Sequence, residues 1–252
     1  MSAREAVVLG CRLSALTMED AVAAIDGYIR EKKTRQAVFL NAGKFAEMKK
    51  DPRVARAVNK ADLRLADGQS VVWAGKFLGA PLPGRVAGID LMERLLAAGP
   101  AKGHRFYFLG ARQEVVRKMA EDCVRRYPGI AIAGYRNGYF TDHEEGEVAG
   151  LIAGSGADIL FVGMSSPRKE LFVERNLSRM NVPFVMGVGG SFDVMAGETR
   201  RAPAWMQNAG LEWCYRLWQE PGRMWRRYLF GNTAFILRVL AQKWRGDDGH
   251  DR

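Results

Sequence analysis

The sequence predicts an α/β fold, a Rossmann-like parallel sheet flanked by helices, with a C-terminal helical appendage that is basic and aromatic. Apolar runs of strand length recur between helix-length segments, which is the pattern of a parallel sheet. These runs are apolar without alternation, so both faces of the sheet are expected to be buried. Five of the six tryptophans lie in the last 48 residues, and residues 200–245 carry nine Lys and Arg against two Glu.

The expected strands begin at residue 35, and the segments between them have one apolar and one charged face, as helices packed on a sheet do. Before this array, Thr17 followed by Asp20 has the spacing of a capping box and predicts the start of a helix. The five expected strands are Ala37–Leu40, Arg105–Leu109, Ile130–Ala133, Ile159–Val162 and Pro183–Val188.

Three regions are expected along the chain: an α/β core over residues 1–198, a helical appendage over 199–245 and a disordered tail over 246–252. Within the appendage, Pro203 indicates a helix start, residues 220–222 indicate a break, and a second helix is expected over 223–244. Among its tryptophans, we expect Trp205 and Trp213 to pack on the core. We expect Trp218 and Trp225 to face a membrane or a lipid.

Composition limits the class of partner. The 252 residues carry a formal charge of +10, which favours nucleic acid, phospholipid headgroups or a phosphorylated substrate without choosing among them. The three cysteines are far apart and odd in number, which favours a reducing compartment. The N-terminal apolar stretch is too short for an export signal and no window approaches 18 apolar residues, so a cytoplasmic protein, soluble or peripheral to the membrane, is expected.

The residues that follow the apolar runs are the first candidates for a site, because open parallel sheets bind ligands beyond the carboxyl ends of their strands. Glycines there allow close backbone approach, and Arg112, Arg168 and Lys169 add positive charge, which suits a nucleoside diphosphate. These strand-end positions are Asn41, Asp67, 110–112, 163–170 and 187–193.

Several common site motifs are missing from the sequence. The three histidines are scattered without metal-ligand spacing, and no Asp-x-Asp pair is placed to hold Mg²⁺ against a diphosphate, so no metal is expected. A P-loop and a GxSxG elbow are also absent, which argues against a P-loop nucleotidase and an α/β-hydrolase. If a diphosphate is the leaving group, arginines must neutralise its charge.

Eight short blocks, taken in order, resemble the WecG/TagA/CpsF family of bacterial glycosyltransferases. Each block alone is weak, but the ordered set is specific and spans about residues 7 to 240. The blocks are Ala66–Gly68, Gly84–Leu91, Phe108–Gly110, Asn137–Phe140, Phe161–Gly163, Gly189–Asp193, Arg201–Trp205 and Leu211–Leu217.

The resemblance implies an inverting, metal-independent transfer of a hexose-type sugar. The donor would be a UDP-sugar and the acceptor a polyprenyl-diphosphate-linked saccharide, at the cytoplasmic face of the inner membrane. Such a reaction serves exopolysaccharide or cell-envelope polymer synthesis and needs no cofactor. The resemblance also implies that the C-terminal segment closes over the site at the membrane, and that members can self-associate as homo-oligomers through surfaces this segment would otherwise cover.

Carried over by position, the proposed catalytic base is Asp67, and Asn41 and Arg85 line the catalytic pocket. A carboxylate at a strand end suits the role of base, although an Asp-Gly pair is also a common exposed turn. The residues expected to bind the donor are Gly110, Tyr139, Gly163, Lys169, Gly189, Gly190 and Asp193. The arginines expected to contact the diphosphate or the acceptor are Arg216, Arg223 and Arg226.

Two positions depart from the family pattern. Phe39 stands where many members have threonine, and Lys169 stands where many have glutamine. An ammonium in place of an amide could pair with a donor carboxylate or a phosphate, so the donor sugar stays open. Two other classes remain as alternatives: a single-stranded nucleic-acid-binding protein that uses the Arg/Trp appendage, and a nucleotide-cofactor enzyme such as a methyltransferase.

Overall fold

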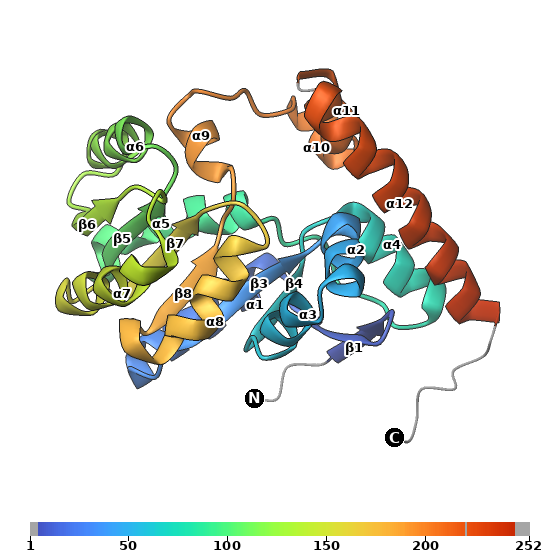
Figure 1. Cartoon of the computed structure of the whole chain (residues 1–252), viewed down its shortest axis with the longest axis horizontal. Helices are drawn as coiled ribbons and strands as arrows, with labels where there is room; N and C mark the ends of the chain where they lie inside the picture. The colour runs from blue at the N-terminus through green and yellow to red at the C-terminus, as the bar shows by residue number, and fades with distance from the viewer. Residues whose placement is uncertain (1–4, 220, 245–252) are drawn as a thin grey trace.

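The computed structural model describes residues 5–219 and 221–244; for residues 204, 208, 216, 221 and 223–230 it describes the backbone alone. The expected disordered tail over 246–252 therefore lies outside the described residues. The described chain forms a six-stranded sheet between two layers of helices, with a long C-terminal helix along one side (Figure 1). The predicted α/β class is confirmed.

The six strands are all parallel, in the order β4-β3-β8-β7-β5-β6. Side chains alternate between the two faces: Phe106 and Phe108 of β5 enter one apolar cluster, and Tyr107 and Leu109 enter another. Both faces of the central strands are thus buried, as their continuous apolar sequence predicted. The strands are β3 (Arg35–Leu40), β4 (Leu63–Ala66), β5 (Arg105–Gly110), β6 (Ala131–Arg136), β7 (Ile159–Gly163) and β8 (Phe184–Gly187).

The helices of the core cover both faces of the sheet. Helices α1, α5 and α6 supply apolar side chains to the cluster on one face, while α2, α3, α4, α7 and α8 pack with the other two clusters. Helix α1 begins at the predicted capping box, in which Thr17 and Asp20 cap each other's backbone N–H groups. The core helices are α1 (Met18–Glu31), α2 (Ala42–Lys50), α3 (Pro52–Asn59), α4 (Gln69–Leu78), α5 (Gly88–Lys102), α6 (Gln113–Arg126), η1 (Asp142–Glu144), α7 (Glu145–Gly154), α8 (Arg168–Met180) and α9 (Ser191–Met195).

Two features were not among the five expected strands. The chain opens with an antiparallel hairpin of β1 (Glu5–Val8) and β2 (Cys11–Ser14). Edge strand β4 also escaped prediction, because Arg64 interrupts its short apolar run. The backbone N–H of Arg64 donates to the Ser14 hydroxyl over 3.2 Å, so the hairpin is tied to this edge of the sheet.

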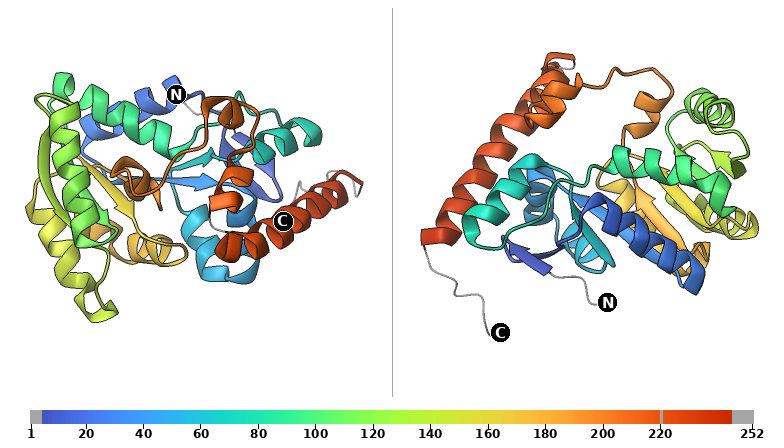
Figure 2. Two further views of the ribbon diagram at one scale, coloured as in Figure 1. Left: turned by 90° about the horizontal axis from the view of Figure 1, so that it is seen from above. Right: turned by 180° about the vertical axis from the view of Figure 1, so that it is seen from behind.

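The C-terminal region forms three helices, α10 (Ala204–Asn208), α11 (Glu212–Gln219) and α12 (Pro221–Trp244). The second predicted helix is thus present and begins two residues earlier than expected. Figure 2 shows α12 running along the outside of α2 and α4. Residue 220, in the predicted break, lies outside the described residues.

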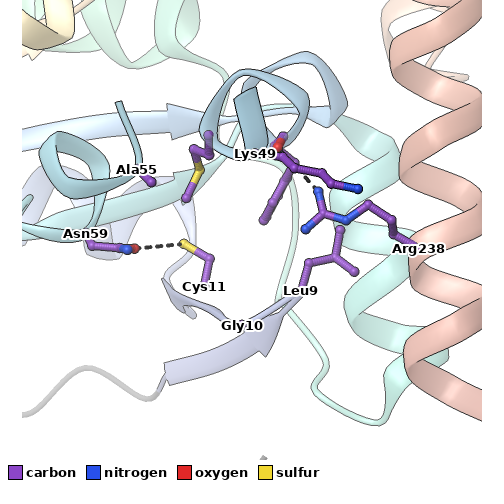
Figure 3. Close-up of a pocket in the computed structure, with 9 residues that line it drawn as sticks. Leu9, Gly10, Cys11, Lys49, Ala55, Asn59 and Arg238 are labelled. Carbon is purple, nitrogen blue, oxygen red and sulfur yellow. Dashed lines mark hydrogen bonds between the residues drawn. The ribbon is translucent and has the colours of Figure 1, made fainter. Parts of the chain in front are cut away.

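The C-terminal half of α12 is attached to the core through a small number of specific contacts. Phe235 is buried against Phe45, with ring centroids 5.4 Å apart. The Gln242 side-chain oxygen accepts from the N–H of Leu9 over 2.9 Å, and an Arg238 guanidinium N–H donates to the carbonyl of Phe45 over 3.4 Å. A small pocket of about 190 Å³ lies beside Arg238, between the hairpin, α2, α3 and α12. Figure 3 shows the residues that line it. Helix α12 therefore shares an apolar cluster with α2 and the hairpin.

Across residues 5–219 and 221–244, every helix is either too short or too polar to traverse a lipid bilayer.

Candidate active site

A cavity of about 760 Å³ opens at the carboxyl ends of the parallel strands, where ligands bind in folds of this class. Its wall includes nearly all of the core residues that the sequence predicted for the site. These are Asn41, Asp67, Arg85, Tyr139, Gly163, Lys169, Gly189, Gly190 and Asp193.

Asp67 follows β4 directly and is held by both carboxylate oxygens. Oδ1 accepts from the backbone N–H of Gly88 over 3.2 Å, and Oδ2 accepts from the side-chain amide of Asn41 over 3.4 Å. Burial raises the pKa of Asp67 above its ordinary value, and the charge of Arg85 opposes that rise. A carboxyl group with a raised pKa that remains close to a cation suits a general base that must take up and release a proton.

Asn41 connects this carboxylate to helix α2. It is the N-cap of that helix, and its side-chain oxygen accepts from the backbone N–H of Lys44 over 3.0 Å. With the oxygen used as the cap, the NH₂ group is the part left to face Asp67. A Cβ on Gly68 would lie 3.0 Å from Cβ of Asn41, so glycine at this position lets the two strand ends approach. The amide therefore orients the carboxylate.

Arg85 reaches the cavity from the loop before α5 and pairs with acidic groups on two elements. Nη1 donates to Glu212 of α11 over 2.8 Å, and Nη2 lies 3.8 Å from Asp90 of α5. Arg201 faces the same two carboxylates, at 2.6 Å from Asp90 and 3.6 Å from Glu212. We did not predict roles for Asp90, Arg201 and Glu212, although all three lie within the blocks that carried the family resemblance.

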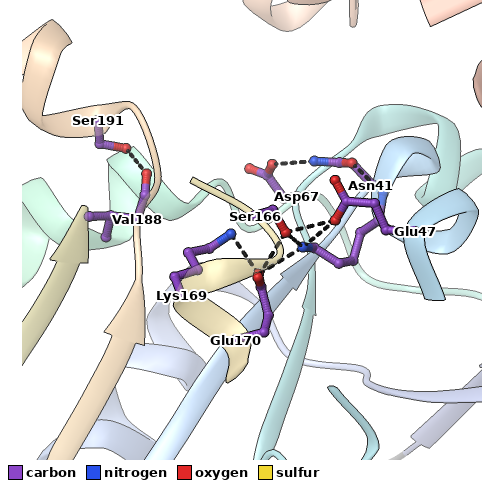
Figure 4. A network of polar contacts seen from close by, with 9 residues as sticks. Asn41, Glu47, Asp67, Ser166, Lys169, Glu170, Val188 and Ser191 are labelled. Carbon is purple, nitrogen blue, oxygen red and sulfur yellow. Dashed lines mark hydrogen bonds and ion pairs between the residues drawn. The ribbon is translucent and has the colours of Figure 1, made fainter. Parts of the chain in front are cut away.

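A buried ionic cluster occupies the cavity wall beside Asp67, as Figure 4 shows. The Lys44 ammonium donates to Glu47 and to Glu170, each over 2.7 Å, and it contacts the hydroxyl of Ser166. Lys169 pairs with Glu170 over 2.6 Å. Burial favours the neutral form of Glu170, but the ammonium groups of Lys169 and Lys44 outweigh this effect and hold its pKa at about 2. Two ammonium groups thus face two carboxylates.

The sequence predicted only part of this ionic cluster. Lys169 was singled out as a departure from the family pattern, but its pairing with Glu170 was not predicted. Lys44 and Glu47 lie on α2, far from α8 along the chain, so their contact with it is a product of the fold. Their spacing of three residues on one helix was the only local indication that they share a face.

The glycines at the strand ends have different roles. Gly189 has a φ of +54°, which favours glycine, and it lies with Gly190 in the loop between β8 and α9 on the cavity wall. At Gly163 a Cβ would lie 2.4 Å from the ring of Phe192, so only glycine fits. Gly110 is not on the cavity wall. A Cβ there would lie 2.4 Å from the backbone of Gly163, so Gly110 allows strands β5 and β7 to approach, and its neighbour Ala111 lines the cavity.

Aromatic side chains stand on the cavity wall as well. Tyr139 is strongly exposed, and so is Trp73 of α4, whose ring would lie 3.5 Å from a Cβ on Gly210 of the appendage. Trp213, which is predicted to pack on the core, lines the cavity and is 39% exposed. The prediction that Trp205 packs on the core is wrong, because its side chain is 65% exposed. Trp218 is exposed, as expected for a residue facing outward, and the side chain of Trp225 lies outside the described residues.

The three arginines expected to contact the diphosphate cannot be placed at the level of side chains. Arg216 lies on α11, and Arg223 and Arg226 lie on α12, but their side chains are outside the described residues. Their binding role stays a prediction. Among the residues that the structure does describe, no three His, Cys, Asp or Glu side chains gather as a metal-binding group would require.

Comparison with known proteins identifies the family. The model of the glycosyl transferase WecG/TagA/CpsF family matches residues 6–249. The chain belongs to this family. It is therefore a glycosyltransferase, as predicted, and membership favours the enzyme over the nucleic-acid-binding alternative. In this WecG/TagA/CpsF transferase, the cavity at the strand ends is the candidate active site.

Two curated relatives carry the same name, N-acetylglucosaminyldiphosphoundecaprenol N-acetyl-beta-D-mannosaminyltransferase. The protein from Bacillus spizizenii is 39% identical over 216 residues, which cover 86% of this chain and 82% of the relative. The protein from Bacillus subtilis is 35% identical over 194 residues, which cover 77% of this chain and 74% of the relative.

Proposed function

We propose that this transferase moves a hexose-type sugar from a UDP-sugar to a polyprenyl-diphosphate-linked saccharide, with inversion and without a metal. The reaction would take place at the cytoplasmic face of the membrane, in exopolysaccharide or cell-envelope polymer synthesis. The names of the two relatives support the acceptor class, because both describe transfer to a diphosphoundecaprenol-linked sugar. The single observation that carries the mechanism is the buried, doubly hydrogen-bonded carboxylate of Asp67 in the cavity.

The proposed chemistry is a single displacement. The acceptor hydroxyl oxygen attacks the anomeric carbon of the donor sugar, and its proton passes to the carboxylate of Asp67. The bond between the anomeric carbon and the β-phosphate oxygen breaks, and UDP leaves with the bonding electron pair. One displacement inverts the anomeric centre, so an α-linked UDP-sugar gives a β-linked product. The word beta in the names of both relatives supports this outcome.

The leaving UDP gains negative charge that a metal or fixed cations must balance. Arg85 is a cation on the cavity wall whose charge acts on Asp67. The proposal assigns further neutralisation to Arg216, Arg223 and Arg226, because the guanidinium group binds phosphate with two parallel hydrogen bonds. These arginines come from the appendage, so its docking would bring charge to the leaving group.

The charges of the ionic cluster affect which class of donor sugar the cavity favours. Lys169 already pairs with Glu170, and the cluster of Lys44, Lys169, Glu47 and Glu170 is neutral as a whole. A donor carboxylate would have to compete with Glu170 for the ammonium of Lys169. The cluster thus favours a neutral hexose or N-acetylhexosamine over a hexuronic acid. Lys169 would position Glu170 and the donor without adding net charge.

Membrane attachment is supported by an apolar surface beside the cavity. Lys243 of α12 lies 5.9 Å from the ring centroid of Phe77 on α4, so the exposed faces of the two helices adjoin. Basic and aromatic side chains together suit the headgroup region of an anionic bilayer. Trp73 belongs to both the surface and the cavity wall, which would place the site opening near lipid. The large exposed apolar side chains described on α4 and α12 are Trp73, Phe77, Ile236, Leu237, Leu240 and Trp244.

The experiment is a transfer assay with a panel of UDP-sugars and a polyprenyl-diphosphate-linked N-acetylglucosamine acceptor in excess EDTA. We expect transfer from one neutral UDP-sugar, with NMR of the product showing an anomeric configuration opposite to that of the donor. Strict dependence on a divalent metal, or retention of configuration, would contradict the proposal. A chain cut before Arg200 that still bound donor but transferred nothing would assign the appendage to the acceptor or the transition state.

A further inference from the structure

Four charged side chains join the C-terminal segment to the rim of the cavity. Arg85 and Asp90 come from the core, and Arg201 and Glu212 come from the segment after β8. Arg85 bonds Glu212 over 2.8 Å, and Arg201 lies 2.6 Å from Asp90, so each cation of one region faces an acid of the other. We propose that Glu212 is a positioning residue, which couples docking of the C-terminal segment to the active-site base through Arg85. This inference deepens the proposed function, since it assumes that Asp67 is the base.

The ion pair of Arg85 and Glu212 is partly buried. The side chains of Arg85 and Glu212 retain only 14% and 21% of their exposure. Solvent therefore screens this pair far less than the exposed ion pairs of the surface. The two residues are 127 positions apart in the chain, so the contact exists only when α11 is docked on the core.

The charges of neighbouring residues act on the pKa of Asp67. Two charged groups act on this carboxyl: Arg85, which lowers its pKa, and Glu212, which raises it, both on top of the dominant effect of burial. Arg85 and Glu212 are themselves faced by Asp90 and Arg201. When Glu212 docks, it offsets the effect of the Arg85 charge on Asp67, and the carboxylate becomes a stronger base. When the segment leaves, the charge of Arg85 acts on Asp67 without the opposing charge of Glu212, which weakens the base.

The strength of the base therefore depends on whether the C-terminal segment is docked. The segment that carries Glu212 also carries the arginines that the proposed function assigns to the diphosphate. Asp67 would therefore be most basic when those arginines are in place. Asp90 holds Arg85 on the core side, so Arg85 stays near Asp67 in both states.

The direct test is a ¹³C NMR titration of the Asp67 carboxyl in the whole chain, with its signal assigned by loss in Asp67→Asn. We expect the pKa of Asp67 to be lower in Glu212→Gln than in the wild type by at least about half a unit. Glu212→Asp keeps the negative charge, so the pKa of Asp67 in this variant should lie closer to the wild-type value. Glu121→Gln removes an exposed carboxylate that pairs with Arg117 on α6, and it should leave the pKa of Asp67 unchanged. An Asp67 pKa in Glu212→Gln that equals or exceeds the wild-type value would overturn the inference.

The kinetic test is the pH profile of kcat/KM. Activity rises with pH as the base loses its proton, so in Glu212→Gln the acid limb should move to lower pH while the plateau falls about tenfold. A variant that had merely lost structure would lose activity at every pH without moving the limb. The NMR titration needs no substrate, so it tests Glu212 even if the sugar transfer of the proposed function is not observed. If no sugar transfer is observed but the pKa of Asp67 is shifted in Glu212→Gln, the proposed function is contradicted and the coupling of Glu212 to Asp67 is established.

Discussion

The side-chain amide of Asn41 donates a hydrogen bond to the carboxylate of Asp67 over 3.4 Å, while its oxygen caps helix α2. One residue thus links the end of β3, the start of α2 and the candidate base at the end of β4. The two functions of this side chain can be separated by substitution, because aspartate and serine both cap helices but lack the amide.

Asn41→Asp should raise the pKa of Asp67, because it places a second carboxyl group beside the first. The acid limb of kcat/KM should then move to higher pH by about one unit, while helix α2 keeps its cap. Asn41→Ser is the matched control, since it keeps a cap without adding charge and should lower kcat with little movement of the limb. Identical pH profiles for the two variants would show that Asn41 does not act on Asp67 in this way.

Asp67→Asn should stabilise the protein at neutral pH. The folded pKa of Asp67 is raised above its ordinary value of 3.8, so the folded state is favoured below that value and loses this advantage as pH rises through the folded pKa. Asparagine has no such titration and can still accept from the N–H of Gly88. The difference in melting temperature should therefore grow with pH above about 4 and then level off, with each kcal/mol worth about 2–4 °C. A variant that melts below the wild type at pH 7 would contradict this expectation.

Glu170→Gln should destabilise the fold by about 3–5 kcal/mol, because it leaves the ammonium groups of Lys44 and Lys169 facing only Glu47. The pKa of Glu170 is lowered from 4.5 to about 2, so its contribution is present above pH 4.5 and is lost as pH falls towards 2. Urea titrations at pH 7 and pH 3 measure the free energy of unfolding of both proteins. The loss of stability in Glu170→Gln should be smaller at pH 3.

The control for that cluster is Glu114→Gln, which removes an exposed carboxylate paired with Arg112 and should change stability by less than about 1 kcal/mol. The double variant Lys169→Gln with Glu170→Gln should recover part of the loss, since it removes both members of one pair. An equal loss of stability at both pH values would mean that packing, not charge, dominates at Glu170.

Phe235→Ala should detach the C-terminal half of α12 from the core. Its ring is buried against Phe45, and removing a buried aromatic side chain costs about 3–5 kcal/mol. Limited proteolysis should cut near α12 faster in this variant, while the sheet remains resistant. Ile236→Ala, a truncation at an exposed neighbouring position, is the control. Equal protection of α12 in both variants would show that Phe235 does not anchor the helix.

The sheet was largely predictable from the sequence, for a physical reason. Strands buried on both faces are continuously apolar, and five such runs were found at or near five of the six strands. Edge strand β4 was missed because Arg64 breaks its apolar run, and the hairpin was missed because its two strands have only four residues each. Asp67 was still predictable, because it is a polar residue that directly follows an apolar segment.

The site was predictable at single positions but not in its connections. Asn41, Asp67 and Arg85 were named from motifs, and the structure brings all three to one cavity. Glu212, the partner of Arg85, comes from a distant part of the chain, and no local pattern reports an ion pair across 127 positions. Gly110 is a different case: its role in donor binding stays a prediction, and a Cβ at this position would meet the backbone of Gly163 on β7.

The role of Asp67 as the base can be measured as the rate of sugar transfer in excess EDTA by wild type and by Asp67→Asn, under saturating donor and acceptor. If Asp67 is the base, the variant should fold normally, bind UDP like the wild type and transfer about 10²–10⁴-fold more slowly. Asp122→Asn, a change at a partly exposed position on α6, should transfer at the wild-type rate. Transfer by Asp67→Asn at the wild-type rate would contradict the mechanism.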